Sequence, residues 1–230
     1  GSSNHSLFIG VFFNNNVPDD MFVDEVRIGT TWEDVTPAVD EPVIYAWNEP
    51  LGGNWTDPDN WSGPAGYPRT PDDHAVLPDL GQGAISIFVE SPVTVGVVRL
   101  SASTNQSYTI DTLSYSTMYF DNTFGDAVIE SEIDVASHQT LRFRFLDLHF
   151  NDDVKIVCGV NTNSQSHNAV VLDDCFYYGS GDITKSGEGG LTVSGTDGSA
   201  YVGTLYVTEG RLYLPEDNPF PNAALDLNNG

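Results

Sequence analysis

The chain has 230 residues, enough for one large domain or two smaller ones, and it carries 33 acidic against 8 basic side chains. Recognition of phosphate needs clustered lysine and arginine, so a formal net charge of −25 excludes nucleic acid as a partner. No apolar run reaches membrane-spanning length, so we predict no insertion into a membrane. The acidic charge favours solubility and attracts Ca²⁺ or Mg²⁺ counterions, as suits a secreted or cell-surface protein. A solvated acidic face without a specific site would carry the same charge.

Residues 1–36 are predicted to form a short β-hairpin. The apolar residues Leu7, Ile9, Val11 and Phe13 open the first strand signal, and a polar turn separates it from a second signal at 21–28. Two strands alone are marginal in water, so this hairpin has to pack on the rest of the chain or on another molecule.

An aromatic loop is expected after a linker at residues 37–44, where proline and acidic residues cluster. Residues 45–78 are rich in Trp, Pro and Gly, and we expect them to form an entry loop that covers the first coil of the next domain. Trp47, Trp55 and Trp61 could stack on sugar rings, or they could lock the loop against the core.

From residue 79 onward the sequence predicts stacked strands. Asp182–Gly230 contains apolar i, i+2 pairs separated by Gly, Asn and Asp, and no single pair could bury much surface alone. The pairs must therefore stack on one another as in a solenoid. Further alternating segments are Ile85–Val89, Val93–Leu100, Tyr108–Phe120, Ala127–Val135, Thr140–Phe150 and Val154–Val160.

One of these segments changes its apolar phase between Phe145 and Leu146. A flat strand cannot do this without turning its buried face outward, so we predict a corner or bulge at that point. The fold class is therefore all-β.

Two resemblances refine this prediction. Residues 7–37, above all VDEVRIGTTWEDVTP, resemble the last hairpin of a laminin-G-like, concanavalin-type sandwich, which implies donor strands or a sandwich remnant with exposed edges. Residues 45–230 resemble the autotransporter-associated β-strand repeat proteins of bacteria, which are passenger-like. The motifs that carry this second resemblance are NWTDPDNWSG, PDDHAVLP, TVGVVRLSASTNQSYTI, IESEIDVASHQTLRF and KSGEGGLTVSG with YVGTLYVTEGRLYL. It implies a right-handed parallel β-helix over residues 79–230.

Calcium is the one metal for which the sequence offers ligands, and no cofactor is required. Asp57, Asp59 and Asn60 place three oxygen donors on one tight loop, and Asp152 with Asp153 forms an acidic pair at a predicted turn. Asp is also a preferred turn residue, so these positions could serve the turns alone.

The two cysteines, Cys158 and Cys175, leave two alternatives open. A disulfide could join neighbouring coils of a secreted protein, or both thiols could be free and buried.

A polysaccharide lyase of this architecture would use an arginine or a lysine as base beside calcium-binding acids. Arg142 and Arg144 project from one side of a predicted strand, with Asp152 and Asp153 a short way on. The alternative is that these arginines pair with acidic side chains on adjacent coils.

The function that we expect is a non-enzymatic, extracellular structural one: a surface stalk, an adhesin shaft or a fibre subunit. Solenoids need capping coils, and Leu225 and Leu227 lie in a closing strand-turn pattern without a polar cap. We expect self-assembly, head to tail, by β-strand addition between this end and the apolar hairpin, which would give filaments. The alternatives are a carbohydrate-binding module for an extracellular polysaccharide and a calcium-dependent polysaccharide lyase.

Overall fold

The computed structural model describes eleven ranges of the chain: 8–14, 22–29, 42–64, 66–81, 83–101, 106–123, 125–132, 139–159, 168–195, 200–214 and 219–227. For the first two ranges only the backbone is described. The chain divides into two compact units, residues 1–41 and residues 42–230.

The first unit contains the predicted hairpin. Strand β1 (Phe8–Asn14) pairs antiparallel with β2 (Phe22–Gly29), with Ile9 opposite Ile28 and Val11 opposite Val26. The register shifts between Phe12 and Phe13. Leu7, expected to belong to the first strand, lies outside the described residues.

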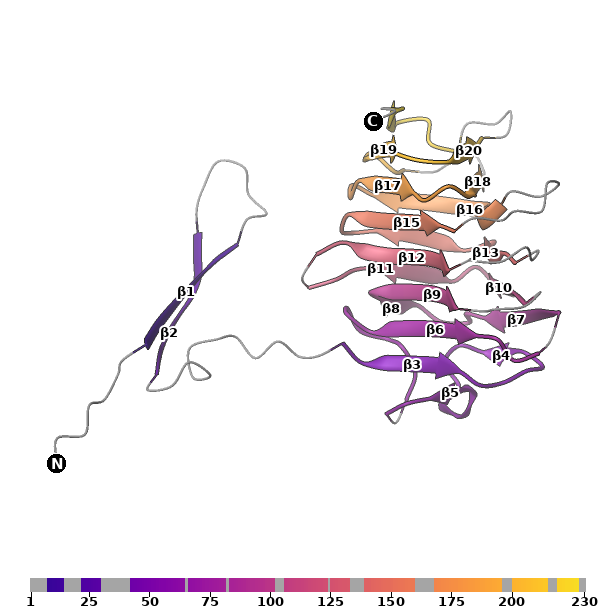
Figure 1. Ribbon diagram of the computed structural model, residues 1–230, viewed down its shortest axis with the longest axis horizontal. Helices are drawn as coiled ribbons and strands as arrows, with labels where there is room; N and C mark the ends of the chain where they lie inside the picture. Colours follow the sequence, from indigo (N-terminus) through magenta and orange to yellow (C-terminus); the bar gives the residue numbers. More distant parts are fainter. Residues whose placement is uncertain are drawn as a thin grey trace. The chain divides into compact units, whose positions relative to one another are not determined.

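The second unit is a β-solenoid of stacked parallel strands, which confirms the predicted all-β parallel β-helix (Figure 1). Its chain winds around three faces. Among the described residues, about four turns have a strand on each of the three faces. Face 1 consists of β3 (Ile44–Trp47), β6 (His74–Pro78), β9 (Val97–Ser101), β12 (Ala127–Glu132), β15 (Val154–Cys158), β17 (Ile183–Ser186), β19 (Thr204–Val207) and β21 (Ala224–Asp226).

The other two faces belong to one sheet that bends at a corner. Strand β16 (Asn168–Gly179) joins them, because its first part pairs with a face 2 strand and its second part with a face 3 strand. Face 2 contains β4 (Gly53–Asn54), β7 (Ala84–Phe88), β10 (Ser107–Asp111), β13 (Leu141–Arg144), β18 (Gly190–Gly195) and β20 (Arg211–Tyr213). Face 3 contains β8 (Val93–Val95), β11 (Thr117–Phe120) and β14 (Asp147–Phe150).

The core is a set of columns inside this three-sided tube. Alternate residues of each strand point inward, so in-register stacking places like side chains above one another. Burial of these columns removes apolar area from water that no single strand could remove alone. One face 2 column, buried throughout except at its last member, contains Ile85, Tyr108, Leu141, Val170, Leu191 and Leu212.

The predicted corner between Phe145 and Leu146 is present. Strand β13 ends on face 2 at Arg144, and β14 begins on face 3 at Asp147. Phe145 adopts a left-handed backbone with φ of 57° and points outward, whereas Leu146 is buried. The corner thus keeps both apolar phases inside the tube.

Two strands that were predicted as continuous are broken by corners. Segment 93–100 divides at Gly96 into β8 and β9, and segment 108–120 divides at residues 112–116 into β10 and β11. A Cβ at Gly96 would lie 2.9 Å from the backbone Cα and N of Asp72 as well as against the Asn122 side chain, so this close approach of two turns favours glycine.

The solenoid also begins earlier than the sequence predicted, because β3 and β6 lie within the expected entry loop of residues 45–78. The short β5 (Trp61–Ser62) pairs antiparallel with β3, and a 3₁₀ turn, η1 (Pro58–Asn60), precedes it. The strands here are very short, and the corners between them are rich in turn residues. The composition of the segment therefore resembles that of a loop, although it contains strands. Ile44, the last residue of the expected linker, starts β3.

Candidate functional site

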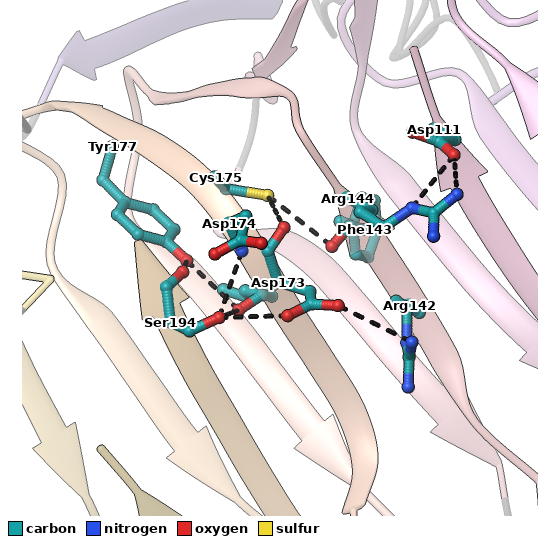
Figure 2. Close-up of polar contacts among 10 residues, drawn as sticks. Asp111, Arg142, Phe143, Arg144, Asp173, Asp174, Cys175, Tyr177 and Ser194 are labelled. Carbon is teal, nitrogen blue, oxygen red and sulfur yellow. Dashed lines mark hydrogen bonds and ion pairs between the residues drawn. The ribbon is translucent and has the colours of Figure 1, made fainter. Parts of the chain in front are cut away.

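The outer side of face 2 contains the most developed cluster of charged side chains, drawn in Figure 2. Arg144 of β13 donates from Nε to the Asp111 carboxylate at 3.0 Å and makes a second, shorter contact from Nη2 to the same oxygen. Asp111 ends β10 on the turn below, and its side chain is 5% exposed. The guanidinium therefore bridges two turns and holds a buried carboxylate.

A second network continues on the turn above. Arg142 lies 3.6 Å from Asp173 of β16, which also accepts a hydrogen bond from the Ser194 hydroxyl at 3.2 Å. The Asp174 N–H donates to the same hydroxyl oxygen, and Tyr177 donates to the backbone oxygen of Ser194. Serine, aspartate and arginine thus connect three turns of face 2.

The electrostatics of this cluster oppose base catalysis by Arg144. The hydrogen bond to Asp111 raises the pKa of Arg144 above its ordinary value, burial opposes this change, and the charges of Asp111 and Asp173 add to it. A general base has to release its proton near the working pH. The geometry is that of arginines paired with acidic side chains on adjacent coils, the alternative to a lyase site.

The three tryptophans that were candidates for sugar binding lie inside the first turns. Trp47, Trp55 and Trp61 are all buried, and their rings meet edge to face at centroid distances of 5.0 and 4.9 Å. Each indole N–H donates to a backbone carbonyl, those of Glu49, Pro68 and Trp55 respectively. Buried rings of this kind lock the loop and offer no face to a sugar.

Several of the calcium candidates make hydrogen bonds with the backbone. Asp57 caps η1 by accepting from the Asp59 N–H at 3.0 Å, and the Asn60 amide donates to a backbone oxygen. Asp152 accepts from the Asp153 N–H at 2.9 Å. Among the residues that the structure describes, no group of three His, Cys, Asp or Glu side chains could hold a metal ion.

Asp153 belongs to a ladder between turns. It accepts from the Asp182 N–H at 2.8 Å, and Asp182 in turn accepts from the Thr204 N–H at 2.7 Å. These carboxylates therefore satisfy backbone groups at one corner of successive turns, which is the role expected of aspartate as a turn residue.

Both cysteines are free and buried, so the structure contains no disulfide between Cys158 and Cys175. Burial raises the pKa of each thiol to about 12. Cys158 ends β15 on face 1, and Cys175 lies on β16 near the corner of faces 2 and 3. Of the two alternatives for the cysteines, a disulfide or two free buried thiols, the structure has the free thiols.

The hypothetical assembly residues divide between the two units. Ile9, Val11 and Phe13 belong to β1, while Leu225 and Leu227 are 48% and 61% exposed near the last strand of the solenoid.

Sequence reasoning missed two features. Lys185 is buried in a face 1 column between Ile156 and Val207, and its ammonium donates to the carbonyls of Gly187 and Glu209. Its burial lowers its pKa. Lys185 is two positions after the inward-facing Ile183, so the alternation of the strand already indicated in the sequence that its side chain points inward.

The second missed feature is a group of exposed aromatic residues at the corner of faces 2 and 3, Tyr115 and Phe145. The phase change in the sequence marks the corner at Phe145, but no such pattern marks the one at Tyr115, where the segment 108–120 was expected to be one strand.

No helix within the described ranges is long and apolar enough to cross a membrane. Comparison of the chain with protein-family models, with curated proteins and with solved structures found no match in any of the three. The solenoid fold is therefore shown by the structure, and the resemblance to autotransporter-associated repeats stays a prediction.

Proposed function

We propose that this chain is a non-enzymatic structural segment of an extracellular bacterial protein, an adhesin shaft or fibre subunit, which lengthens by β-strand addition at the β21 end of the solenoid. The observation that carries this proposal is the loss of burial along the last turns. Leu191 and Leu205 are buried, whereas Leu225 is 48% exposed. In a solenoid each turn relies on the next to cover its apolar residues.

The geometry of the β21 end suits an incoming strand. Among the described strands, β21 is the edge strand of the face 1 sheet at this end of the solenoid, and an edge strand presents backbone groups to a new partner. Beside it lies an apolar hollow of about 150 Å³, lined by Leu205, Leu214, Phe220, Ala223, Ala224 and Leu225. Backbone pairing would supply affinity, and the hollow would select an apolar side chain.

The hairpin of another copy is the proposed donor. Its strand β1 contains Ile9, Val11 and Phe13, which alternate along the sequence as an inserted strand requires. Because donor and acceptor surfaces differ, such a contact does not close on itself and produces filaments.

The two alternative functions have less support. A carbohydrate module built on the Trp47, Trp55 and Trp61 loop would need exposed indoles, and these are buried. A lyase that uses Arg142 or Arg144 as its base has less support because both arginines pair with carboxylates on adjacent turns.

The test is the mass of the full chain in solution as its concentration rises, measured by sedimentation and electron microscopy. Wild type is expected to form oligomers or filaments, and the Leu225→Asp, Leu227→Asp double variant is expected to lose them. Deletion of residues 1–41 distinguishes two routes of assembly. Assembly should be lost if the hairpin is the donor, and it should remain if the solenoids pack end to end. Leu113→Asp, a 74% exposed position in the middle of the solenoid, is the matched control. A monodisperse wild-type monomer at high concentration would remove the proposal.

A further inference from the structure

Three successive turns share an unusual backbone at the corner between faces 2 and 3. Tyr115, Phe145 and Asp174 have φ values of 48°, 57° and 50°, in the left-handed region. Glycine or asparagine accepts this conformation at lower cost than other residues do. The chain nevertheless has a tyrosine and a phenylalanine at two of these positions.

These aromatic residues point outward. Tyr115 is 73% exposed, Phe145 is 41% exposed, and the neighbouring Leu113 is 74% exposed. The Tyr115 ring meets the ring of the outward-facing Phe176 at 6.3 Å. An apolar ridge of Leu113, Tyr115, Phe145 and Phe176, called the corner ridge below, therefore follows the solenoid axis. The left-handed backbone is what turns the chain at this corner, but it does not require aromatic side chains there. A contiguous group of exposed apolar rings on a protein surface indicates a binding role.

Polar groups flank the corner ridge on the face 2 side. The Arg144 guanidinium lies 5.1 Å from the Phe145 ring centroid and is bound to Asp111, and Arg142 is paired with Asp173. These pairs leave donors and acceptors next to the rings without free positive charge.

The charges at the corner indicate which class of ligand could bind there. Both guanidinium groups are compensated by carboxylates, and the whole chain carries −25, so an anionic polymer would be repelled. Apolar rings beside paired charges suit an uncharged ligand that has both C–H faces and hydroxyl groups. A neutral sugar polymer meets this requirement.

We propose that the corner ridge binds a neutral polysaccharide chain, with sugar rings packed against Tyr115, Phe145 and Phe176 and hydroxyl groups turned toward the Arg144 side of the ridge. The ridge draws its rings from three turns, and the Tyr115 and Phe176 rings of the first and third turns have centroids 6.3 Å apart. Rings from several turns favour a chain of sugars over a single sugar. The site differs from the tryptophan loop and from the assembly surface at β21.

The experiment uses affinity gel electrophoresis of the full chain through neutral polymers (mannan, xyloglucan and β-1,3-glucan) and through the anionic polygalacturonate. Tyr115→Asn and Phe145→Asn remove one ring each while placing a residue that accepts the left-handed backbone. Their Tm is therefore expected to stay equal or to rise, which separates loss of binding from loss of folding. Loss of one ring is expected to weaken binding about three- to tenfold.

Leu51→Asn, which also replaces an exposed apolar side chain, is the matched control and should bind as wild type does. The Leu225→Asp, Leu227→Asp variant should also keep its binding, so failure of the assembly proposal and failure of this one are distinguishable. Retardation by a neutral polymer that both corner variants weaken supports the proposal. It is overturned if no neutral polymer retards wild type, or if the corner variants bind equally well. It also falls if those variants change only the mass in solution, since the ridge would then be a contact between copies.

Discussion

At the scale of single residues, an imidazole stands inside a column of tyrosine rings on the outer side of face 3. The ring of His149 lies 4.8 Å from that of Tyr119 below and 4.6 Å from that of Tyr178 above. Burial between these rings lowers the pKa of His149 below its usual 6.5, and the nearby Asp147 opposes the change. The column therefore favours neutral histidine.

This pKa change makes the stability depend on pH. The unfolded chain binds a proton on His149 near pH 6.5, and the folded chain binds it only at lower pH. The contribution of neutral His149 is thus complete above pH 6.5 and is lost as the pH falls through the folded pKa. His149→Phe keeps a ring in the column, and its Tm should fall less than that of wild type between pH 7.5 and pH 5.5. Tyr178→Phe is the control, and equal pH dependence in wild type and His149→Phe would contradict the prediction.

At the scale of one element, strand β13 shows two arginines with different surroundings. Arg142 and Arg144 are two positions apart and face the same side. Arg142 reaches Asp173, a third exposed, at 3.6 Å, whereas Arg144 is bound to Asp111, which is 5% exposed. An ion pair at the surface contributes little to the free energy of unfolding, but a buried carboxylate that loses its partner lowers it considerably.

The two arginines should therefore differ when each is replaced by Met. Arg144→Met leaves Asp111 buried and uncompensated, and it should lower the free energy of unfolding by about 2 to 4 kcal/mol. Arg142→Met should lower it by only about 0 to 1 kcal/mol. Urea denaturation at pH 7 measures both losses, and equal losses would show that Asp111 does not depend on Arg144.

At the scale of the whole molecule, the chain carries a net charge of −25, and several carboxylates of its solenoid serve the turns. Asp153 and Asp182 accept backbone N–H groups at one corner, and Asp57 caps η1. Self-repulsion of this charge destabilises the folded state and is screened by salt.

Added salt should therefore raise the Tm of the full chain, with most of the increase between about 0.01 and 0.3 M NaCl, where the screening length shortens most. Because the described residues contain no group of three His, Cys, Asp or Glu side chains that could hold a metal ion, CaCl₂ and MgCl₂ at equal concentration should raise the Tm equally. An extra increase with calcium, removed by a chelator, would reveal a specific calcium site.

Much of this architecture could be predicted from local patterns. Pairs such as Leu191 with Val193, closed by Gly and Asp, specify short strands with one buried side, and such strands must stack. The phase change at Phe145 and Leu146 located a corner, because an apolar phase is a property of neighbouring residues. These signals are local, so the sequence by itself determined an all-β solenoid and one of its corners.

Only the tertiary structure decided which residues meet and which are exposed. Arg144 and Asp111 are 33 positions apart and become neighbours only because one turn of the solenoid lies between them. The same stacking buries Trp55, leaves Tyr115 outside and keeps Cys158 and Cys175 as free thiols. The physical reason is that register between turns is set by the lengths of the intervening corners, and no short stretch of sequence contains that information.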